Sequence, residues 1–318
     1  MRRQTGGDIA LTRVALAVAA VLAVAMPVRA DYPERPILLI VSGEAGSSLD
    51  TAARLIAPYL QKHLDFDVPV SVENRDSMAG AEAYRVLAES PADGHVLALA
   101  VLPDLVTLPI QGNGGYDPAT LTNLGAIGFQ PTVIVVPAAS PWSSVDDLIA
   151  AARDAATPLR FGVTDSGSGT ALAARRLFAA PGVGALTNPY TTEAGLRGAL
   201  ASGVVAAAAM GRPTALRLNG EVRALAGDIG EPEALLTIAA PAGLLSEIAR
   251  SLRDTVRRIA HDKAFAHAAG LRGIVASYLS PDEVAARRQA AEELYGRLWR
   301  IDPWIGASDK AGPSRLLK

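Results

Sequence analysis

Short apolar segments alternate with segments of helical pattern along most of this chain, and this alternation constrains the fold more than any other feature. The apolar segments are bounded by glycine, proline, serine and aspartate, which is typical of short buried strands. Because strand, loop and helix follow one another repeatedly, the sequence predicts an α/β fold with largely parallel sheets. Two blocks of alternation within 318 residues further predict two lobes rather than one sheet.

The segments are assigned from their periodicity and from the turn residues between them. The predicted strands cover residues 37–41, 68–72, 96–101, 133–136, 159–163, 204–209, 222–226 and 235–239. The predicted helices cover residues 50–63, 79–89, 143–154, 170–180, 196–201, 245–261, 263–270 and 280–300. The third of these helices opens with a capping-box pattern at Ser144.

Residues 1–30 have the pattern of a secretory signal peptide. Three arginines precede or begin an apolar run over residues 14–26, Pro27 ends the run, and the small residues Val28 and Ala30 precede the expected cleavage point. The run is shorter than the roughly 20 residues of a spanning helix, although an uncleaved anchor is the alternative. Cleavage removes four arginines and one aspartate, which changes the formal net charge from −2 to −5. A periplasmic location is therefore expected.

The sequence lacks the residues that several classes of protein chemistry require. The chain has no cysteine, which excludes disulfide scaffolds, thiolate metal sites and cysteine nucleophiles, and its charge argues against a nucleic-acid binder. Residues 165–169 have glycines at the wrong spacing for a nucleophile elbow, and no phosphate loop occurs. No metal spacing occurs among the histidines, which are His63, His95, His261 and His267. We expect no metal, no cofactor and no enzymatic activity, because nothing supplies both a nucleophile and a base.

Three loops share one design, in which small and hydroxyl residues follow a predicted strand and open a helix. They are residues 43–48, 76–80 and 164–170. Small residues let backbone N–H groups turn inward, and a helix N-terminus offers about half a positive charge to an anion. The N–H groups of residues 46–48 and 79–81 are therefore expected to converge on one anion. The alternative is that these residues only cap their helices.

An ordered set of short segments resembles the receptors of tripartite tricarboxylate transporters, the Bug family. No single segment is diagnostic, but the set covers nearly the whole mature chain in the family's order. The segments are residues 32–41, 50–57, 72–75, 91–97, 116–118, 133–137, 159–162, 189–190, 222–226 and 239–243.

The resemblance implies a periplasmic, two-lobed Venus flytrap with a hinge of crossing strands and a small carboxylate held between the lobes. Residues 31–131 and 240–318 are expected to form one lobe, and residues 132–239 the other. The implied partners are the ligand and the integral-membrane subunits of a tripartite transporter, and the receptor itself is expected to be a monomer. Closure around the ligand is expected to create the surface that the membrane subunits recognise.

The resemblance also assigns the ligand site to the three loops. Backbone N–H groups of the first two loops are expected to bind the carboxylate, and hydroxyls of the third to complete the site. The expected ligand-binding residues are Gly46, Ser47, Ser48, Asp50, Met78, Ala79, Gly80, Thr164, Ser168, Gly169, Thr170 and Arg212. Arg212 is assigned as a bidentate partner of the carboxylate, with an ordinary exposed arginine as the alternative.

The first two loops depart from the family pattern. The family's triple glycine followed by Thr-Asp is replaced at residues 46–50, and its Pro-Gly-Ala-Gly-Gly is replaced at residues 76–80. Side chains at glycine positions restrict positive φ angles and close backbone approach. Glu44 and Asp76 also add negative charge near the expected pocket. A divergent receptor, which binds a less anionic ligand or acts as a periplasmic sensor or adaptor, is therefore the alternative function.

Overall fold

The computed structural model describes residues 32–64, 68–112, 114–164, 168–179, 183–227, 229, 234–301 and 303. The chain divides into a short unit, residues 1–34, and a large unit, residues 35–318, which contains all the helices and strands given below. The predicted signal peptide lies outside the described residues.

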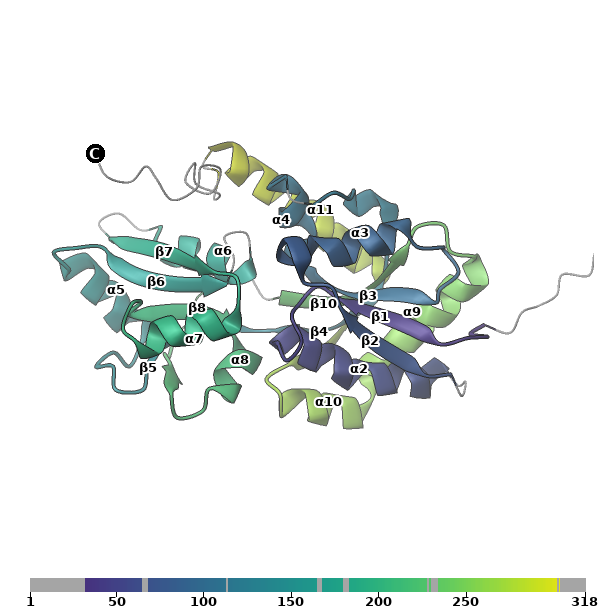
Figure 1. Ribbon diagram of the computed structural model, residues 1–318, viewed down its shortest axis with the longest axis horizontal. Helices are drawn as coiled ribbons and strands as arrows, with labels where there is room; N and C mark the ends of the chain where they lie inside the picture. Colours follow the sequence, from purple (N-terminus) through teal and green to yellow (C-terminus); the bar gives the residue numbers. More distant parts are fainter. Residues whose placement is uncertain are drawn as a thin grey trace, which may run out of the picture. The chain divides into compact units, whose positions relative to one another are not determined.

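The first sheet of the large unit has six strands in the order β11-β4-β10-β3-β1-β2 (Figure 1). They are β1 (Ile37–Val41), β2 (Val70–Asn74), β3 (Val96–Leu102), β4 (Leu121–Gln130), β10 (Ala234–Pro241) and β11 (Val275–Leu279). Its central strands are almost wholly buried, which explains their continuous apolar sequence.

Helices cover both faces of this sheet. One face carries α2 (Ser48–Leu64), α9 (Ser246–His261) and α10 (Lys263–Gly270). The other carries α3 (Ala81–Glu89), α4 (Asp104–Ile110) and α11 (Pro281–Ile301). Two short 3₁₀ segments, η1 (Ser77–Gly80) and η2 (Pro118–Thr120), precede α3 and β4. Tyr84 of α3 is fully buried against the sheet among leucines and alanines.

The second sheet has five strands in the order β7-β6-β8-β5-β9. They are β5 (Thr132–Pro137), β6 (Leu159–Thr164), β7 (Ala185–Tyr190), β8 (Ala207–Gly211) and β9 (Val222–Ala224). The helices α5 (Val145–Asp154) and α6 (Gly169–Leu177) pack on one face, and α7 (Glu193–Ala201) and α8 (Arg212–Arg217) pack on the other. Each side of the sheet thus has its own apolar core. The capping-box prediction for α5 is confirmed, with Ser144 at the N-cap and Asp147 as its partner.

Two connections join the sheets. β4 continues directly into β5 after Gln130, and the chain returns between β9 and β10. The predicted two-lobed α/β fold is therefore confirmed. The lobe boundaries at 131/132 and 239/240 stay a proposal, and the pairing of β10 with β3 and β4 indicates that the return precedes Ala234.

The prediction of largely parallel sheets is wrong. Among the described residues, four strand pairs are parallel and five are antiparallel. The antiparallel pairs all involve β10, β11 or β5, which are the strands that cross between the sheets or enter after the crossing. Because a strand that returns from the other lobe enters its sheet from the opposite end, these pairs cannot follow the βαβ rule.

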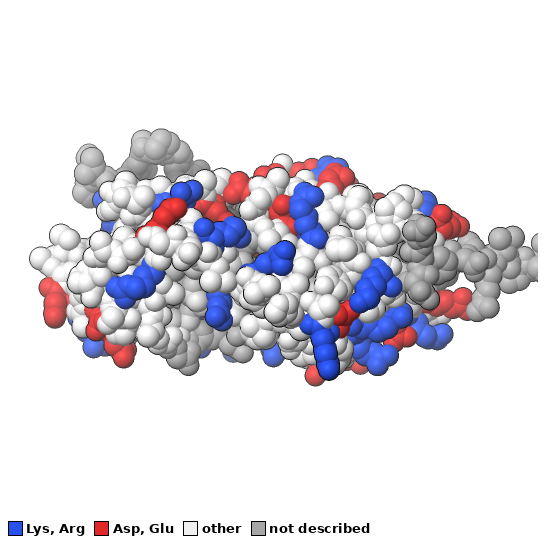
Figure 2. Space-filling view, turned by 90° about the horizontal axis from the view of Figure 1, so that it is seen from below, with Lys and Arg blue, Asp and Glu red and all other residues white. Residues whose placement is uncertain are grey.

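Charges of both signs are interspersed over the face formed by α2, α8 and α10 (Figure 2). Some of them are paired, such as Lys62 of α2, whose ammonium lies 2.7 Å from the Asp262 carboxylate at the start of α10. Within the described part of the chain, no helix is both long enough and apolar enough to cross a bilayer.

Candidate functional site

The three predicted loops follow the carboxyl ends of β1, β2 and β6, as ligand loops do in open α/β sheets. In the first loop, the Ser42 hydroxyl lies 3.3 Å from the Tyr84 hydroxyl, which also accepts a hydrogen bond from the Val101 N–H at 3.1 Å. Burial raises the pKa of Tyr84 to about 12, so this hydroxyl stays protonated. The buried tyrosine thereby ties the start of the first loop to the core of the sheet.

The first loop closes on itself through Asp50. The Gly46 N–H donates to the Asp50 carboxylate at 2.9 Å, and the Ser47 hydroxyl accepts from the Asp50 N–H at 3.2 Å as a helix cap. Burial alone raises the pKa of Asp50, but hydrogen bonds from Arg54 and from the Gly46 amide outweigh it and hold the pKa below its usual range. The structure therefore gives Asp50 a role inside its own loop.

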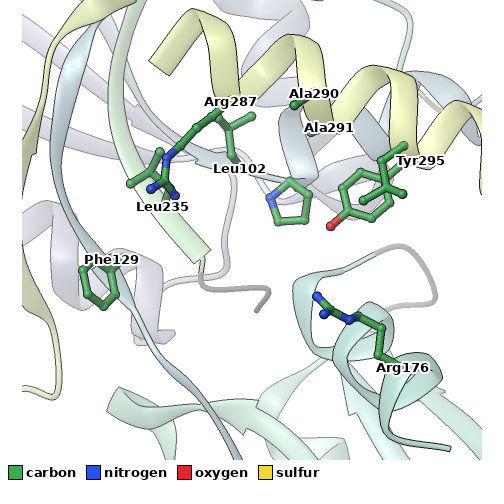
Figure 3. Close-up of a pocket in the computed structure, with 10 residues that line it drawn as sticks. Leu102, Phe129, Arg176, Leu235, Arg287, Ala290, Ala291 and Tyr295 are labelled. Atoms are coloured by element: carbon green, nitrogen blue, oxygen red, sulfur yellow. The ribbon is translucent and has the colours of Figure 1, made fainter. Parts of the chain in front are cut away.

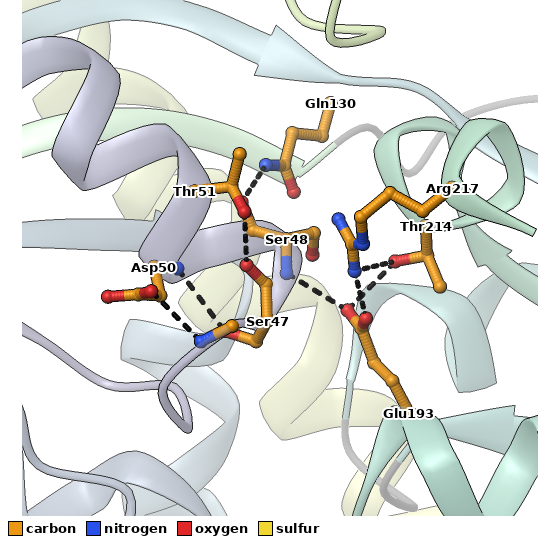
Figure 4. A network of polar contacts seen from close by, with 9 residues as sticks. Ser47, Ser48, Asp50, Thr51, Gln130, Glu193, Thr214 and Arg217 are labelled. Carbon is orange, nitrogen blue, oxygen red and sulfur yellow. Dashed lines mark hydrogen bonds and ion pairs between the residues drawn. The ribbon is translucent and has the colours of Figure 1, made fainter.

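One donor of the first loop points away from it. The Ser48 N–H, at the first turn of α2, donates to Glu193 Oε1 at 3.1 Å (Figure 4). Glu193 belongs to α7 of the second sheet, 145 residues further along the chain. The same oxygen accepts from the Thr214 hydroxyl at 2.8 Å, and Arg217 forms an ion pair with the carboxylate. The Glu193 carboxylate thus binds the Ser48 N–H, which is a favourable donor to an anion because it lies at a helix N-terminus.

The second loop adopts an unusual backbone. Met78 and Ala79 have φ angles of 55° and 57°, and Gly80 follows with 90°. Left-handed conformations cost a residue with a side chain about 1–2 kcal/mol, so two in succession indicate a loop held in shape by its surroundings. A Cβ atom on Gly80 would lie 2.3 Å from the Ser42 carbonyl oxygen, so only glycine lets the two loops pack this closely.

The expected convergence of amides on one anion is wrong for this conformation. The N–H groups of Gly46 and Ser47 donate to Asp50 and Glu44, and that of Gly80 donates to the Asp76 carbonyl. The N–H of Ala81 also has acceptors, in the carbonyls of Ser77 and Met78. The loops satisfy these donors internally because their side chains and tight turns place acceptors nearby.

The third loop gathers hydroxyl groups. The Thr170 hydroxyl lies 2.7 Å from that of Thr164 and 2.8 Å from that of Ser168. Ser168 caps α6 by accepting from the Ala171 N–H at 3.3 Å. Residues 165–167 of the predicted third loop lie outside the described residues.

The third loop also lies close to the first sheet. A Cβ atom on Gly169 would lie 3.5 Å from Pro103, which follows β3. The third loop is therefore near the carboxyl end of β3 as well as that of its own strand, β6.

Arg212 was predicted to bind the ligand carboxylate, but the arginine that pairs with a carboxylate in this region is Arg217. Arg212 begins α8, its N–H donates to the Pro131 carbonyl at 2.7 Å, and its side chain is exposed. Arg217, at the end of the same helix, holds Glu193. None of the sequence patterns predicts a site role for Glu193, Thr214 or Arg217. The pattern at Thr192 and Glu193 is that of a helix start, and nothing local to it indicates a contact with α2.

A second region with positive charge lies between α6 and α11 (Figure 3). It is a cavity of about 260 Å³, into which the Arg176 guanidinium and the Tyr295 hydroxyl point from the two helices. Its lining residues are Leu102, Pro103, Phe129, Arg176, Leu235, Arg287, Ala290, Ala291, Leu294 and Tyr295. A larger cavity of about 770 Å³ shares Arg176 and Tyr295. Among the described residues, no cluster of three His, Asp or Glu side chains is placed to hold a metal ion.

Comparison with known proteins identifies the family. Residues 52–236 match the family described as "Tripartite tricarboxylate transporter family receptor". The chain belongs to this family. Protein BugT of Bordetella pertussis is 28% identical over 315 residues, which span 91% of this chain and 93% of BugT.

Solved structures show the same receptor fold. Rpa4515 of R. palustris, solved with adipate, superposes with a TM-score of 0.77 at 26% identity, over 85% of this chain and 97% of that protein. MatC of Rhodopseudomonas palustris, solved with bound malate, gives a TM-score of 0.71 at 19% identity, over 84% and 99%. The resemblance of the sequence to the Bug receptors is thus confirmed. The ligand-binding role of each predicted residue stays a prediction.

Proposed function

We propose that this chain is a periplasmic receptor that captures a small organic acid between its two lobes and delivers it to the membrane subunits of a tripartite transporter. Residues 1–30 direct its export, and the mature receptor acts as a monomer without catalytic activity. Its membership of the receptor family and its likeness to the adipate-bound structure support this function. The ligand class is inferred from this chain's own geometry.

The observation that carries the proposal is the contact between Ser48 and Glu193. The Ser48 N–H at the start of α2 binds a carboxylate in the present conformation, at 3.1 Å. A backbone N–H at a helix N-terminus is a favourable donor to an anion, because the helix dipole adds to the hydrogen bond. The hydroxyls of Thr164, Ser168 and Thr170 supply further donors for the distal part of an acid.

The test is calorimetric titration of the mature protein with four- to six-carbon dicarboxylates, adipate and malate among them. The matched control for each acid is its neutral diamide, which keeps the length and removes both charges. We expect saturable binding of at least one acid and no binding of its diamide. Absence of binding by every acid at millimolar concentration would contradict the proposed ligand class.

The divergent-receptor alternative has a specific observation in its favour. Gly46, Ser47, Gly80 and Ala81 use their amides within the two loops, and Glu193 adds a negative charge beside Ser48. A site with fewer donors and an added carboxylate is suited to a neutral or cationic group. Binding of amino acids or diamides in preference to diacids, in the same titration, would favour this alternative.

A further inference from the structure

Glu193 is a carboxylate of the second lobe that reaches the first. Two of its partners, Thr214 and Arg217, lie on α8 of its own lobe, whereas the Ser48 N–H lies on α2 of the other. The contact therefore connects the two lobes directly. Within the first lobe, the side-chain amide of Gln130 at the end of β4 donates to the Ser48 carbonyl at 3.4 Å and so helps to hold the start of α2.

The position of Glu193 is fixed by its own helix. Thr192 caps α7 by accepting from the Gly195 N–H at 3.0 Å, and Glu193 is the first residue of that helix. Gly162 of β6 lets the helix pack closely, since a Cβ atom there would lie 2.4 Å from the Leu196 side chain. The side chain of Glu193 is 22% exposed. The carboxylate is thus held between α2 and α8 rather than extended into solvent.

One backbone N–H group cannot serve two carboxylates at full strength. If the proposed function is right, the carboxylate of an incoming acid and that of Glu193 require the same Ser48 N–H. The two carboxylates also repel each other when both are close to this N–H group, because both are negatively charged. An acid that takes this position must therefore displace Glu193 from Ser48.

We propose that Glu193 is a built-in competitor that sets the specificity of this receptor: its carboxylate occupies the Ser48 N–H and holds the two lobes together, and only an acid that replaces it there binds. This inference rests on the proposed function for the identity of the competing ligand. The apparent affinity of such a receptor is reduced by the fraction of molecules in which the position is free. Removing the carboxylate therefore opens the empty receptor and tightens the binding of acids.

The experiment compares wild type with Glu193→Ala and with Glu221→Gln. Glu221 is a matched control, because it lies in the same lobe and pairs with Arg197 at 2.7 Å in an exposed ion pair. The chain has no cysteine, so exposed sites for a fluorophore pair can be introduced by Arg250→Cys in one lobe and Ala156→Cys in the other. Energy transfer between them reports opening without ligand, and calorimetry reports the affinity for adipate and malate.

We expect Glu193→Ala to lower energy transfer in the empty receptor and to tighten acid binding about tenfold, whereas Glu221→Gln changes neither. Unchanged energy transfer, or weaker acid binding by Glu193→Ala, would overturn the competitor role; the latter would make Glu193 a ligand contact. If no variant binds any acid, the proposed ligand class fails. Energy transfer still decides whether Glu193 closes the cleft.

Discussion

The first two loops of the first lobe lie at the ends of neighbouring parallel strands, yet they accommodate side chains at the family's glycine positions in different ways. In the loop at Gly46–Asp50, Gly46 alone has a positive φ angle, and hydrogen bonds to Glu44 and Asp50 hold the turn. In the loop at Ser77–Gly80, the backbone keeps three left-handed residues, two of which carry side chains. One loop is therefore stabilised by hydrogen bonds, and the other is held in shape against conformational strain.

The two loops therefore contribute differently to the proposed ligand site. The first loop keeps one donor directed toward the second lobe, the Ser48 N–H. The second loop supports the first, because Gly80 packs against the Ser42 carbonyl. The donor role of the first loop and the supporting role of the second can be separated by substitutions. These substitutions change hydrogen bonds, close packing or backbone strain.

The largest effect is expected at the contact between the loops. Gly80→Ala combines a left-handed backbone with a Cβ atom 2.3 Å from the Ser42 carbonyl, so we expect a loss of about 2–3 kcal/mol in the free energy of unfolding. Gly112→Ala is the matched control, because Gly112 has a φ of 78° and open space around its Cβ position. It should lose only about 1 kcal/mol in urea unfolding. Equal losses would show that the loops do not depend on close approach.

A smaller, pH-dependent effect is expected in the first loop. The pKa of Asp50 is lowered in the folded state, so its contribution to stability is present above the unfolded pKa of about 3.9 and is lost as the pH falls towards the folded value. Asp50→Asn should cost about 1 kcal/mol at pH 7 and progressively less below pH ~4.

The control for Asp50→Asn is Asp254→Asn, which removes an exposed ion pair with Arg257. That substitution should change the free energy of unfolding by less than about 0.5 kcal/mol. The measurement is urea unfolding of each variant and wild type from pH 3 to pH 8. A cost for Asp50→Asn that does not change with pH would contradict the role of its charge in the loop.

The smallest effect is expected from relieving strain in the second loop. Ala79→Gly removes the cost of a left-handed alanine, about 1–2 kcal/mol, and adds the entropy cost of glycine, about 0.5–1 kcal/mol. The net result should be a protein more stable by about 0.5 kcal/mol. Ala266→Gly, on an exposed face of α10, should instead destabilise by about 1 kcal/mol. If both substitutions destabilise in thermal unfolding, the second loop stores no strain at Ala79.

The sequence predicted the elements whose local pattern matches their burial. β1, at residues 37–41, and α10, at residues 263–270, have the predicted bounds. β4 was missed because Gly125 and Gly128 interrupt its apolar pattern. A Cβ atom at Gly128 would lie 2.3 Å from the Val275 carbonyl, so that glycine serves the approach of β11, which no local pattern shows.

The candidate site was predictable where it depends on a single loop. Ser48 follows from the small residues before α2, and the hydroxyl cluster follows from the residues around Ser168. Glu193 was not predictable, because its role depends on a contact across 145 residues and on Arg217 of another helix. Long-range packing, rather than composition, determines which carboxylate accepts a hydrogen bond from which backbone N–H group.

The proposed function depends most directly on the Ser48 N–H as the donor for a bound carboxylate. Two substitutions isolate it: Ser48→Pro removes the N–H at the first turn of α2, where proline is tolerated, and Ser48→Ala keeps the N–H and removes only the hydroxyl. In titrations with the acid that binds wild type, we expect Ser48→Pro to weaken affinity at least about tenfold and Ser48→Ala to leave it within about twofold. Equal affinity of the two variants would contradict the claim and would direct attention to the cavity lined by Arg176 and Arg287.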